Sequence, residues 1–332
     1  MLGAREFYEM NKPKVVVTRR WPAEVERELA QRFDVELSTD DEPLSLAQLQ
    51  SALRGADALC PTVTDTLSAE LLDIEGRRVR VIGNFGVGFN HIDIAAAQKL
   101  AITVTNTPEV LTDCTADLAM TLLLMVARRA GEGERHVRTQ AWQGWRPTHM
   151  MGTKVTGKTL GLVGFGRIAR ALAHKAHFGF GMRILFHDPY PPADAVTYAL
   201  GASACASLDE LLAQSDFVSL HCPGGAATRH LIDAARLATM RSSAFLINTA
   251  RGDVIDPEAL VEALATRRIA GAGLDVYAGE PRVPAALLGL DNVVLLPHLG
   301  SASHETRIAM GMRVIENLEA FFAGHEPRDR VV

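Results

Sequence analysis

Short, uninterrupted apolar runs alternate with stretches of helical periodicity along this chain, in two separate blocks. In the first block, the run Lys14–Thr18 (KVVVT) is followed by a helical pattern over Pro22–Arg32. Parallel strands that are buried on both faces give such continuous Val, Ile and Leu runs, whereas half-exposed strands alternate apolar and polar residues. Strand–helix alternation is typical of βαβ units. The sequence therefore predicts an α/β protein with parallel sheets.

The remaining elements are expected as follows. The first block, about residues 1–105, has further strands at Asp57–Cys60, Val79–Gly83 and Ile102–Thr105 and a helix at Ile92–Leu100. A long helix over about 113–129 and a polar loop over Arg138–Met151 come next. The second block, about 155–295, has strands at Thr159–Val163, Arg183–Phe186, Phe217–Leu220, Ala244–Ile247, Gly273–Val276 and Val293–Leu296. Helices are expected at Ala169–Ala176, Leu208–Ala213, Asp233–Thr239, Pro257–Ala265 and His304–Phe322.

Length, charge and cysteine usage exclude several classes of protein. At ~100–200 residues per domain, 332 residues suggest two domains. The 34 basic and 39 acidic residues give a net charge of −5, which argues against nucleic-acid binding. The four cysteines are far apart and form no CxxC pair, which suits a reducing compartment and argues against a metal site.

Two further segments bear on membranes and targeting. The most apolar stretch, Leu118–Ala127, is far shorter than the ~20 residues that cross a bilayer. The first 14 residues mix charges of both signs and have no apolar core, so we interpret them as a short extension and not as a signal peptide. We therefore expect a cytoplasmic protein with no membrane partner.

A glycine-rich turn in the second block points to a nucleotide. In Thr159–Ala169 (TLGLVGFGRIA) an expected strand leads into Gly164 and Gly166, and a helix follows. Gly164 permits a tight turn, and Gly166 lets the backbone approach a pyrophosphate at the helix N-terminus. Ala169 occupies the third glycine position of GxGxxG and is small enough for close helix–strand packing. The pattern predicts a dinucleotide-binding site.

An acidic residue at the end of the next expected strand favours NAD over NADP. Asp188 lies 24 residues after Gly164, where a carboxylate accepts hydrogen bonds from the adenosine ribose and repels a 2′-phosphate. Arg183 stands too early to hold such a phosphate, and no Arg or Lys follows Asp188 before Arg229. The alternative interpretation is that the glycines make only a structural turn and that Asp188 caps a turn before Pro189.

Three ionisable residues follow expected strands and suggest the chemistry. They are Arg251, Glu280 and His298. Ligands of open α/β sheets bind at the C-terminal ends of the strands, so the three side chains could reach one crevice. A guanidinium holds a carboxylate, an imidazole exchanges a proton near neutral pH, and a carboxylate fixes the tautomer of that imidazole. Each residue alone also fits a surface turn, a solvated loop or a structural histidine. Together with the nucleotide motif they indicate reduction of a small 2-keto acid.

Several segments resemble the signatures of the NAD(P)-dependent D-2-hydroxyacid dehydrogenases, in the right order. They are Gly83–Asp93 (GNFGVGFNHID), Asn106–Pro108, His221–Pro223 with Thr228, Asn248–Gly252 (NTARG), Gly273–Val276 with Glu280–Pro281, and Pro297–Ser301 (PHLGS). The resemblance runs from about Lys14 to Phe322. Within the family, Thr115–Ala119, Ala127–Arg129, Trp142–Trp145 and the glycine segment look closest to the glyoxylate/hydroxypyruvate reductases.

The resemblance implies two Rossmann-like, doubly wound domains with parallel sheets and an active site in the cleft between them. The substrate domain would be discontinuous, about 1–107 plus 297–332, and the NAD-binding domain would be 108–296. Members are commonly homodimers through the cofactor domains. The implied reaction is hydride transfer from NADH to a small 2-keto acid, glyoxylate or hydroxypyruvate in kind.

The resemblance also implies roles for individual residues. Arg251 would bind substrate, His298 would be the proton donor and Glu280 its partner. The backbone amides of Val87 and Gly88 would hold the substrate carboxylate. The implied cofactor contacts are the phosphate-facing amides of Arg167 and Ile168, the lining residues Pro223 and Thr228, and Asp275 at the nicotinamide carboxamide with Thr249, Ala250 and Gly300 nearby.

Three departures from the family pattern stand out. Ala169 replaces the third glycine, and Gly224-Gly225 follows Pro223 in place of an apolar–polar pair. The glyoxylate reductases often carry Asn-Arg or Arg-x-Arg where this chain has Asp188-Pro189, so the two indications of cofactor differ. Competing functions are a nucleotide-sensing binding protein similar to transcriptional corepressors of this fold family, and a related dehydrogenase of formate or phosphite.

Overall fold

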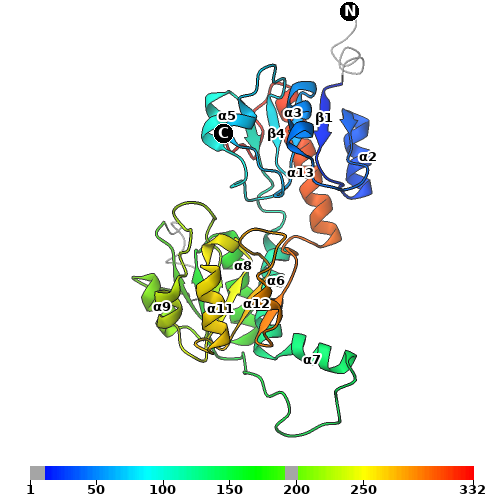
Figure 1. Cartoon of the computed structure of the whole chain (residues 1–332). Coiled ribbons are helices and arrows are strands. Elements are labelled where there is room, and N and C mark those ends of the chain that lie inside the picture. The colour runs from blue at the N-terminus through cyan, green and yellow to red at the C-terminus, as the bar shows by residue number, and fades with distance from the viewer. Residues whose placement is uncertain (1–11, 191–200) are drawn as a thin grey trace, which may run out of the picture. The chain divides into compact units, whose positions relative to one another are not determined.

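The computed structural model describes residues 12–190 and 201–332, so most of the expected N-terminal extension lies outside the described residues. The chain forms two compact units (Figure 1). Unit 1 runs up to Leu111 and resumes at Ala302–Val332, and unit 2 is Thr112–Ser301. Unit 1 is therefore built from both ends of the chain, and unit 2 from the segment between them. The resemblance described above implies crossings near Pro108 and Pro297.

Unit 1 is built on a five-stranded parallel sheet with the order β2-β1-β3-β4-β5. Its strands are β1 (Lys14–Val17), β2 (Asp34–Glu36), β3 (Ala58–Cys60), β4 (Val81–Gly83) and β5 (Thr103–Thr105). Its helices are α2 (Ala23–Arg32), α3 (Leu46–Gly55), α4 (Ala69–Leu72), α5 (Ile94–Lys99) and α13 (His304–Phe322). The strand order reverses between β1 and β3, as in doubly wound folds.

Helices cover both faces of this sheet. Side chains of α3, α4 and α5 share one buried cluster with Leu59, Ile82 and Val104 of the strands. On the other face α13 packs on β4 so closely that a Cβ on Gly83 would lie 2.7 Å from the Val314 side chain. Beyond α13, the N–H of Val331 donates to the carbonyl of Val104 at 2.7 Å. The last residues of the chain thus extend the sheet at β5.

Unit 2 is built on a seven-stranded parallel sheet with the order β12-β11-β10-β9-β6-β7-β8. Its strands are β6 (Thr159–Val163), β7 (Arg183–His187), β8 (Ser203–Ala204), β9 (Phe217–Leu220), β10 (Phe245–Asn248), β11 (Gly271–Leu274) and β12 (Val293–Leu295). Its helices are α6 (Thr112–Ala127), α7 (Ala130–Arg138), α8 (Arg167–Phe180), α9 (Leu208–Gln214), α10 (Ala234–Thr239), α11 (Pro257–Ala265) and α12 (Ala285–Leu288). The order is that of a dinucleotide-binding sheet, with its switch point between β6 and β9.

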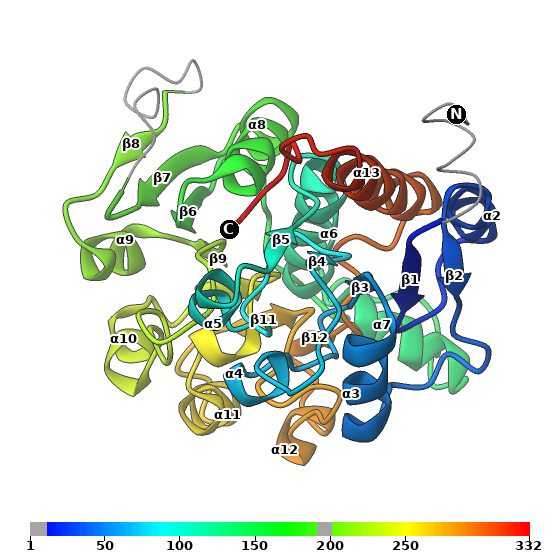
Figure 2. The same ribbon diagram turned by 90° about the horizontal axis from the view of Figure 1, so that it is seen from above.

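Alternate residues of these strands point into two separate cores. Leu162 and Phe186 pack with the side chains of α6 and α8, whereas Val218 and Leu246 pack with those of α9, α10 and α11. Figure 2 shows α8 and α9 on opposite sides of β6 and β7. The prediction of an α/β fold with two parallel, doubly wound sheets is confirmed, and none of the described helices is long and apolar enough to cross a membrane.

Candidate active site

The nucleotide motif forms a turn at the switch point of the unit 2 sheet. Gly164 follows β6 with a φ of 86°, and a Cβ there would lie 3.0 Å from the backbone of His221 and Cys222, which follow β9. Only glycine fits this left-handed conformation and close approach. Gly166 is the N-cap of α8 and offers no side-chain cap. Arg167 and Ile168 are the first residues of the helix, whose N-terminus favours an anion.

Asp188 lies beside this turn and supports it. One of its carboxylate oxygens accepts from the Phe165 N–H at 2.8 Å, and the other accepts from the Tyr190 N–H at 2.8 Å. Asp188 therefore does cap a turn, as the alternative interpretation of the sequence expected. A carboxylate has about four lone-pair sites, so each oxygen can take a further hydrogen bond from a ribose hydroxyl.

The residues expected along the dinucleotide follow β9 and β10. The Thr228 hydroxyl donates to the Pro223 carbonyl at 2.6 Å and closes that loop. The Ala250 N–H donates to the Asn248 side chain at 2.9 Å. The buried Thr249 hydroxyl has no hydrogen-bond partner in the described part of the chain. This orphaned group and the uncapped start of α8 are the two features that fit a bound dinucleotide.

His298 and Glu280 form a hydrogen-bonded pair beyond β12 and β11. The distance from Nδ1 of His298 to Oε2 of Glu280 is 2.8 Å, and about a third of each side chain is exposed. The other oxygen of Glu280 accepts from the Tyr277 N–H at 2.9 Å. Burial would raise the pKa of Glu280, but the hydrogen bond and charge of His298, the Tyr277 N–H and the charge of Arg251 hold it below its ordinary value. The carboxylate is therefore ionised at neutral pH.

Arg251 follows β10 and is only partly exposed. Its guanidinium donates to the Ala250 carbonyl at 2.7 Å, and its own carbonyl accepts from the Asn248 side chain at 2.9 Å. Burial lowers the pKa of Arg251, while the charges of Glu280 and Asp253 raise it. A guanidinium stays protonated in proteins, so this end of the sheet presents a fixed positive charge.

Asp275 supports the segment that carries His298. Its two oxygens accept from the N–H groups of Leu299 and Gly300 at 2.7 and 2.8 Å, and its carbonyl accepts from the His298 N–H at 2.9 Å. Burial raises the pKa of Asp275, and these N–H groups and the charge of His298 lower it. The sequence suggested only a cofactor contact here, because hydrogen bonds to a following loop depend on the path of that loop.

The loop after β4 in unit 1 contains Val87 and Gly88. The Asn84 amide donates to the carbonyls of Gly86 and Gly88 at 3.0 Å, and the Asn106 amide donates to the Val87 carbonyl at 2.8 Å. The N–H groups of Val87 and Gly88 have no acceptor among residues 12–190 and 201–332. Two backbone donors are thus held ready on this loop. The supporting role of Asn84 and Asn106 was not identified from the sequence, although each directly follows an expected strand.

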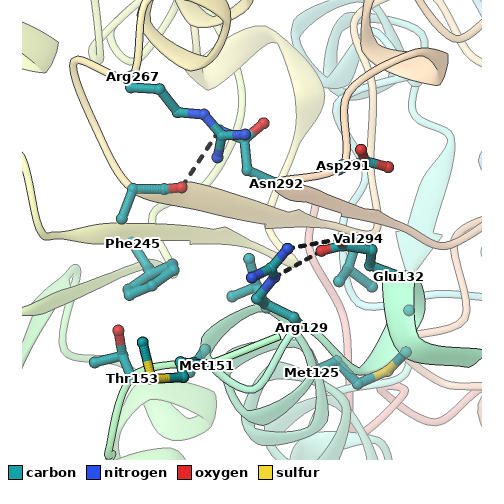
Figure 3. Close-up of a pocket in the computed structure, with 15 residues that line it drawn as sticks. Met125, Arg129, Glu132, Met151, Thr153, Phe245, Arg267, Asp291, Asn292 and Val294 are labelled. Carbon is teal, nitrogen blue, oxygen red and sulfur yellow. Dashed lines mark hydrogen bonds and ion pairs between the residues drawn. The ribbon is translucent and has the colours of Figure 1, made fainter. Parts of the chain in front are cut away.

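A cavity lies at the other end of the unit 2 sheet, next to the first residues of β10 and β11 and just before β12 (Figure 3). Its volume is about 280 Å³. Among its lining residues, Arg129 forms two hydrogen bonds with Glu132, and the Asn292 side chain donates to the Ala270 carbonyl at 3.3 Å (Figure 3). None of the predicted site residues lines it. No group of three His, Cys, Asp or Glu side chains suited to a metal occurs among the described residues.

Comparison with known proteins assigns the family. The model of the D-isomer specific 2-hydroxyacid dehydrogenase NAD-binding domain matches residues 120–300. The chain belongs to the D-2-hydroxyacid dehydrogenase family. It is 44% identical over 320 residues to a glyoxylate reductase of Thermococcus onnurineus, covering 95% of each chain. It is also 44% identical over 322 residues to one of Korarchaeum cryptofilum, covering 96% of each.

A solved structure of this D-2-hydroxyacid dehydrogenase family gives a further comparison. It is the NADPH-dependent glyoxylate/hydroxypyruvate reductase of Sinorhizobium meliloti in complex with NADP and malonate. The sequences are 34% identical, the TM-score is 0.86, and 97% of each chain is covered. Unit 2, which contains the glycine turn, corresponds to the NAD-binding domain of the family.

Proposed function

We propose that this dehydrogenase reduces small 2-keto acids of the glyoxylate or hydroxypyruvate kind with NADH. The observation that carries the proposal is the 2.8 Å pair of His298 and Glu280, which follows the strands of an NAD-binding sheet. The relatives with 44% identity are named glyoxylate reductases, which supports the same substrate class.

The proposed chemistry divides among three side chains and one cofactor. The bound dihydronicotinamide supplies the hydride. Arg251 holds the substrate carboxylate through its planar fork, and the N–H groups of Val87 and Gly88 add two donors. Because Nδ1 of His298 is engaged by Glu280, Nε2 is the nitrogen that gives its proton to the carbonyl oxygen. Glu280 keeps the proton of Nδ1 in place and stabilises the charged imidazolium.

We propose NAD as the preferred cofactor. The support is Asp188, whose carboxylate stands beside the glycine turn, where it would meet the adenosine ribose. A 2′-phosphate there would face a like charge. The S. meliloti relative is named NADPH-dependent, so the preference of this chain depends on its own residues and requires direct measurement.

We further propose that unit 1 is the substrate domain and that the enzyme is a homodimer. Support for the dimer comes from α7 and the segment after it, which Figure 1 shows at the periphery of unit 2. Four large apolar side chains are exposed there, and burying them against a second copy would remove apolar surface from water. They are Val137, Trp142, Trp145 and Met151.

The four free cysteines fit a cytoplasmic location.

The deciding experiment is a set of steady-state assays with glyoxylate, hydroxypyruvate, pyruvate and a bulkier keto acid, each with NADH and NADPH. Turnover of a small keto acid with NADH is expected. Binding of NADH without turnover of any keto acid would instead favour a nucleotide-sensing protein. Sedimentation velocity on the same preparation tests the dimer, and a monomer would contradict it.

A further inference from the structure

Tyr277 stands in the sequence between Asp275 and Glu280, the two acidic residues that follow β11. It contacts the segments that follow β10, β11 and β12, which contain the three proposed catalytic residues. We propose that Tyr277 is a positioning residue, which holds His298 and Glu280 in the alignment of their 2.8 Å hydrogen bond. The inference rests on the proposed function of that pair. It concerns a residue that contacts neither the substrate nor the hydride in the proposed mechanism.

The hydroxyl of Tyr277 links its own strand end to that of β12. Its oxygen is 2.8 Å from the Leu296 carbonyl and 3.2 Å from the Leu274 carbonyl. A phenol donates one proton, so the shorter contact with Leu296 is the main hydrogen bond. Leu296 stands two residues before His298, at the point where the pairing of the two strands ends. The hydroxyl therefore anchors the start of the segment that carries the imidazole.

The backbone of Tyr277 holds the other partner. Its N–H donates to one oxygen of Glu280 at 2.9 Å, and the second oxygen of Glu280 binds His298 at 2.8 Å. One residue thus fixes the carboxylate through its main chain and the histidine segment through its side chain. A shift of Tyr277 would change the distance between Glu280 and His298 from both sides.

The segment that follows β10 packs against Tyr277 as well. A Cβ on Gly252 would lie 1.9 Å from the carbonyl carbon of Tyr277 and 2.3 Å from its oxygen. Only glycine permits this approach, because the atoms that a side chain would meet belong to the backbone. Arg251, which precedes Gly252, is therefore set against the peptide of Tyr277. The three strand ends meet at one residue.

His298 needs such support because of its backbone. Its φ is 56°, a left-handed conformation that non-glycine residues adopt only where the surroundings hold them. In its own unit, the charged groups that act on it are Glu280 and Asp275, with Arg251 beyond Glu280. Burial raises the pKa of Tyr277 to about 12, so its hydroxyl remains a donor throughout the range in which the enzyme would be assayed.

The test is Tyr277→Phe, which removes the hydroxyl and keeps the ring. Loss of one hydrogen bond predicts a fall of about 3–10-fold in kcat for reduction. The pH at which reduction is half lost should also move down, because a looser Glu280 stabilises the imidazolium less. The dissociation constant of NADH should stay unchanged. Thr266→Val is the control, since it also removes a hydroxyl that donates to a backbone carbonyl, that of Glu262 at 2.7 Å, at the exposed end of α11, and it should alter neither quantity.

Two further variants keep the result interpretable. Tyr277→Leu removes the ring as well, so it should lose more stability than Tyr277→Phe yet move the pH midpoint equally. In a Glu280→Gln background, Tyr277→Phe should cause no further pH shift. A Tyr277→Phe enzyme with the wild-type kcat and pH profile overturns the inference while leaving the proposed function intact. Retention of full kcat by His298→Ala would overturn the proposed function itself.

Discussion

Charged groups lie near both ends of the strands β10, β11 and β12, and they are stabilised differently at the two ends. At the N-terminal ends, hydrogen bonds between Arg129 and Glu132 raise the pKa of the first and lower that of the second, so each favours the charged form of the other. At the C-terminal ends, burial is the largest influence and works against charge: it lowers the pKa of Arg251 and raises that of Asp275. Mutually satisfied charges are typical of structure, and charges held against burial are typical of function.

The sharpest test of this difference is His298→Ala. Removal of the proton donor at the C-terminal end should lower kcat by roughly 10²–10⁴-fold, while NADH binding remains nearly intact. Stopped-flow or steady-state reduction of glyoxylate, with NADH binding followed by fluorescence, measures both. A kcat within a few-fold of the wild type would show that the proton comes from elsewhere.

Asp188 follows β7, which lies towards the opposite edge of the same sheet from β12, and its charge can be tested in the same way. The wild-type enzyme should prefer NADH to NADPH by roughly 10–100-fold in kcat/KM, because charged hydrogen bonds contribute ~1.5–3 kcal/mol each. Asp188→Ala should narrow this preference, mainly through weaker NADH binding, and Asp188→Arg should improve the use of NADPH.

Asp188→Asn is the informative control, since its amide oxygen can still accept from the Phe165 N–H. It separates the charge of the side chain from its support of the turn. A wild-type enzyme that prefers NADPH would show that the carboxylate does not serve the ribose.

Arg251→Lys tests whether the buried cation is a substrate ligand. A point charge cannot replace the planar fork, so KM for the keto acid should rise roughly 10-fold. The dissociation constant of NADH should change little. The opposite pattern, with altered NADH binding and an unchanged KM, would assign Arg251 to the cofactor.

Glu280→Gln tests the charge of the pair without removing its shape. Because its neighbours hold the pKa of Glu280 below the ordinary value, the carboxylate is anionic at neutral pH and favours the imidazolium. Without it, the pH at which reduction is half lost should fall by on the order of one unit. The pH at which oxidation reaches half of its maximum should fall by a similar amount. Full pH profiles in both directions provide the measurement, and two unmoved midpoints would count against Glu280.

The smallest effect on activity is expected for a change at the N-terminal ends of β10, β11 and β12. A Cβ on Gly271 would lie 2.5 Å from the Asn292 carbonyl, so Gly271→Ala should reduce the free energy of unfolding by ~1–3 kcal/mol. The kcat of the folded fraction should stay at the wild-type value. Gly252→Ala is its counterpart at the catalytic end, where a similar clash should lower kcat. Denaturant unfolding measures the loss of stability, and active-site titration gives the kcat of the folded fraction. If both variants lost kcat equally, the difference between the two ends of the sheet would be contradicted.

Local patterns in the sequence were sufficient where one residue type determines one geometry. The helix α11 spans Pro257–Ala265, as predicted, and Asp256 caps it through the N–H groups of Glu258 and Ala259. The strand β6 and the helix α13 have the predicted bounds, because a continuous apolar run and a long helical repeat define them.

Elements without such patterns were missed or displaced. The strand Asp34–Glu36 is short and largely exposed, so it has no apolar run. The strand β11 begins at Gly271, two residues before the prediction, since its first three residues are small and their pairing with β10 is tertiary. In the site, the pair of Glu280 and His298 was expected, but the bridging by Tyr277 depends on how two loops meet.

The discontinuity of unit 1 has a consequence for synthesis on the ribosome. The helix α13 and the residues that pair with β5 are translated after unit 2, yet both belong to the unit whose sheet begins at Lys14. Asp329 is buried there with Arg313 and Asn317, which fixes the end of the chain. Domains generally fold as units while the chain emerges. We therefore expect the nascent chain to complete unit 2 first, with β1 to β5 waiting for α13 to emerge.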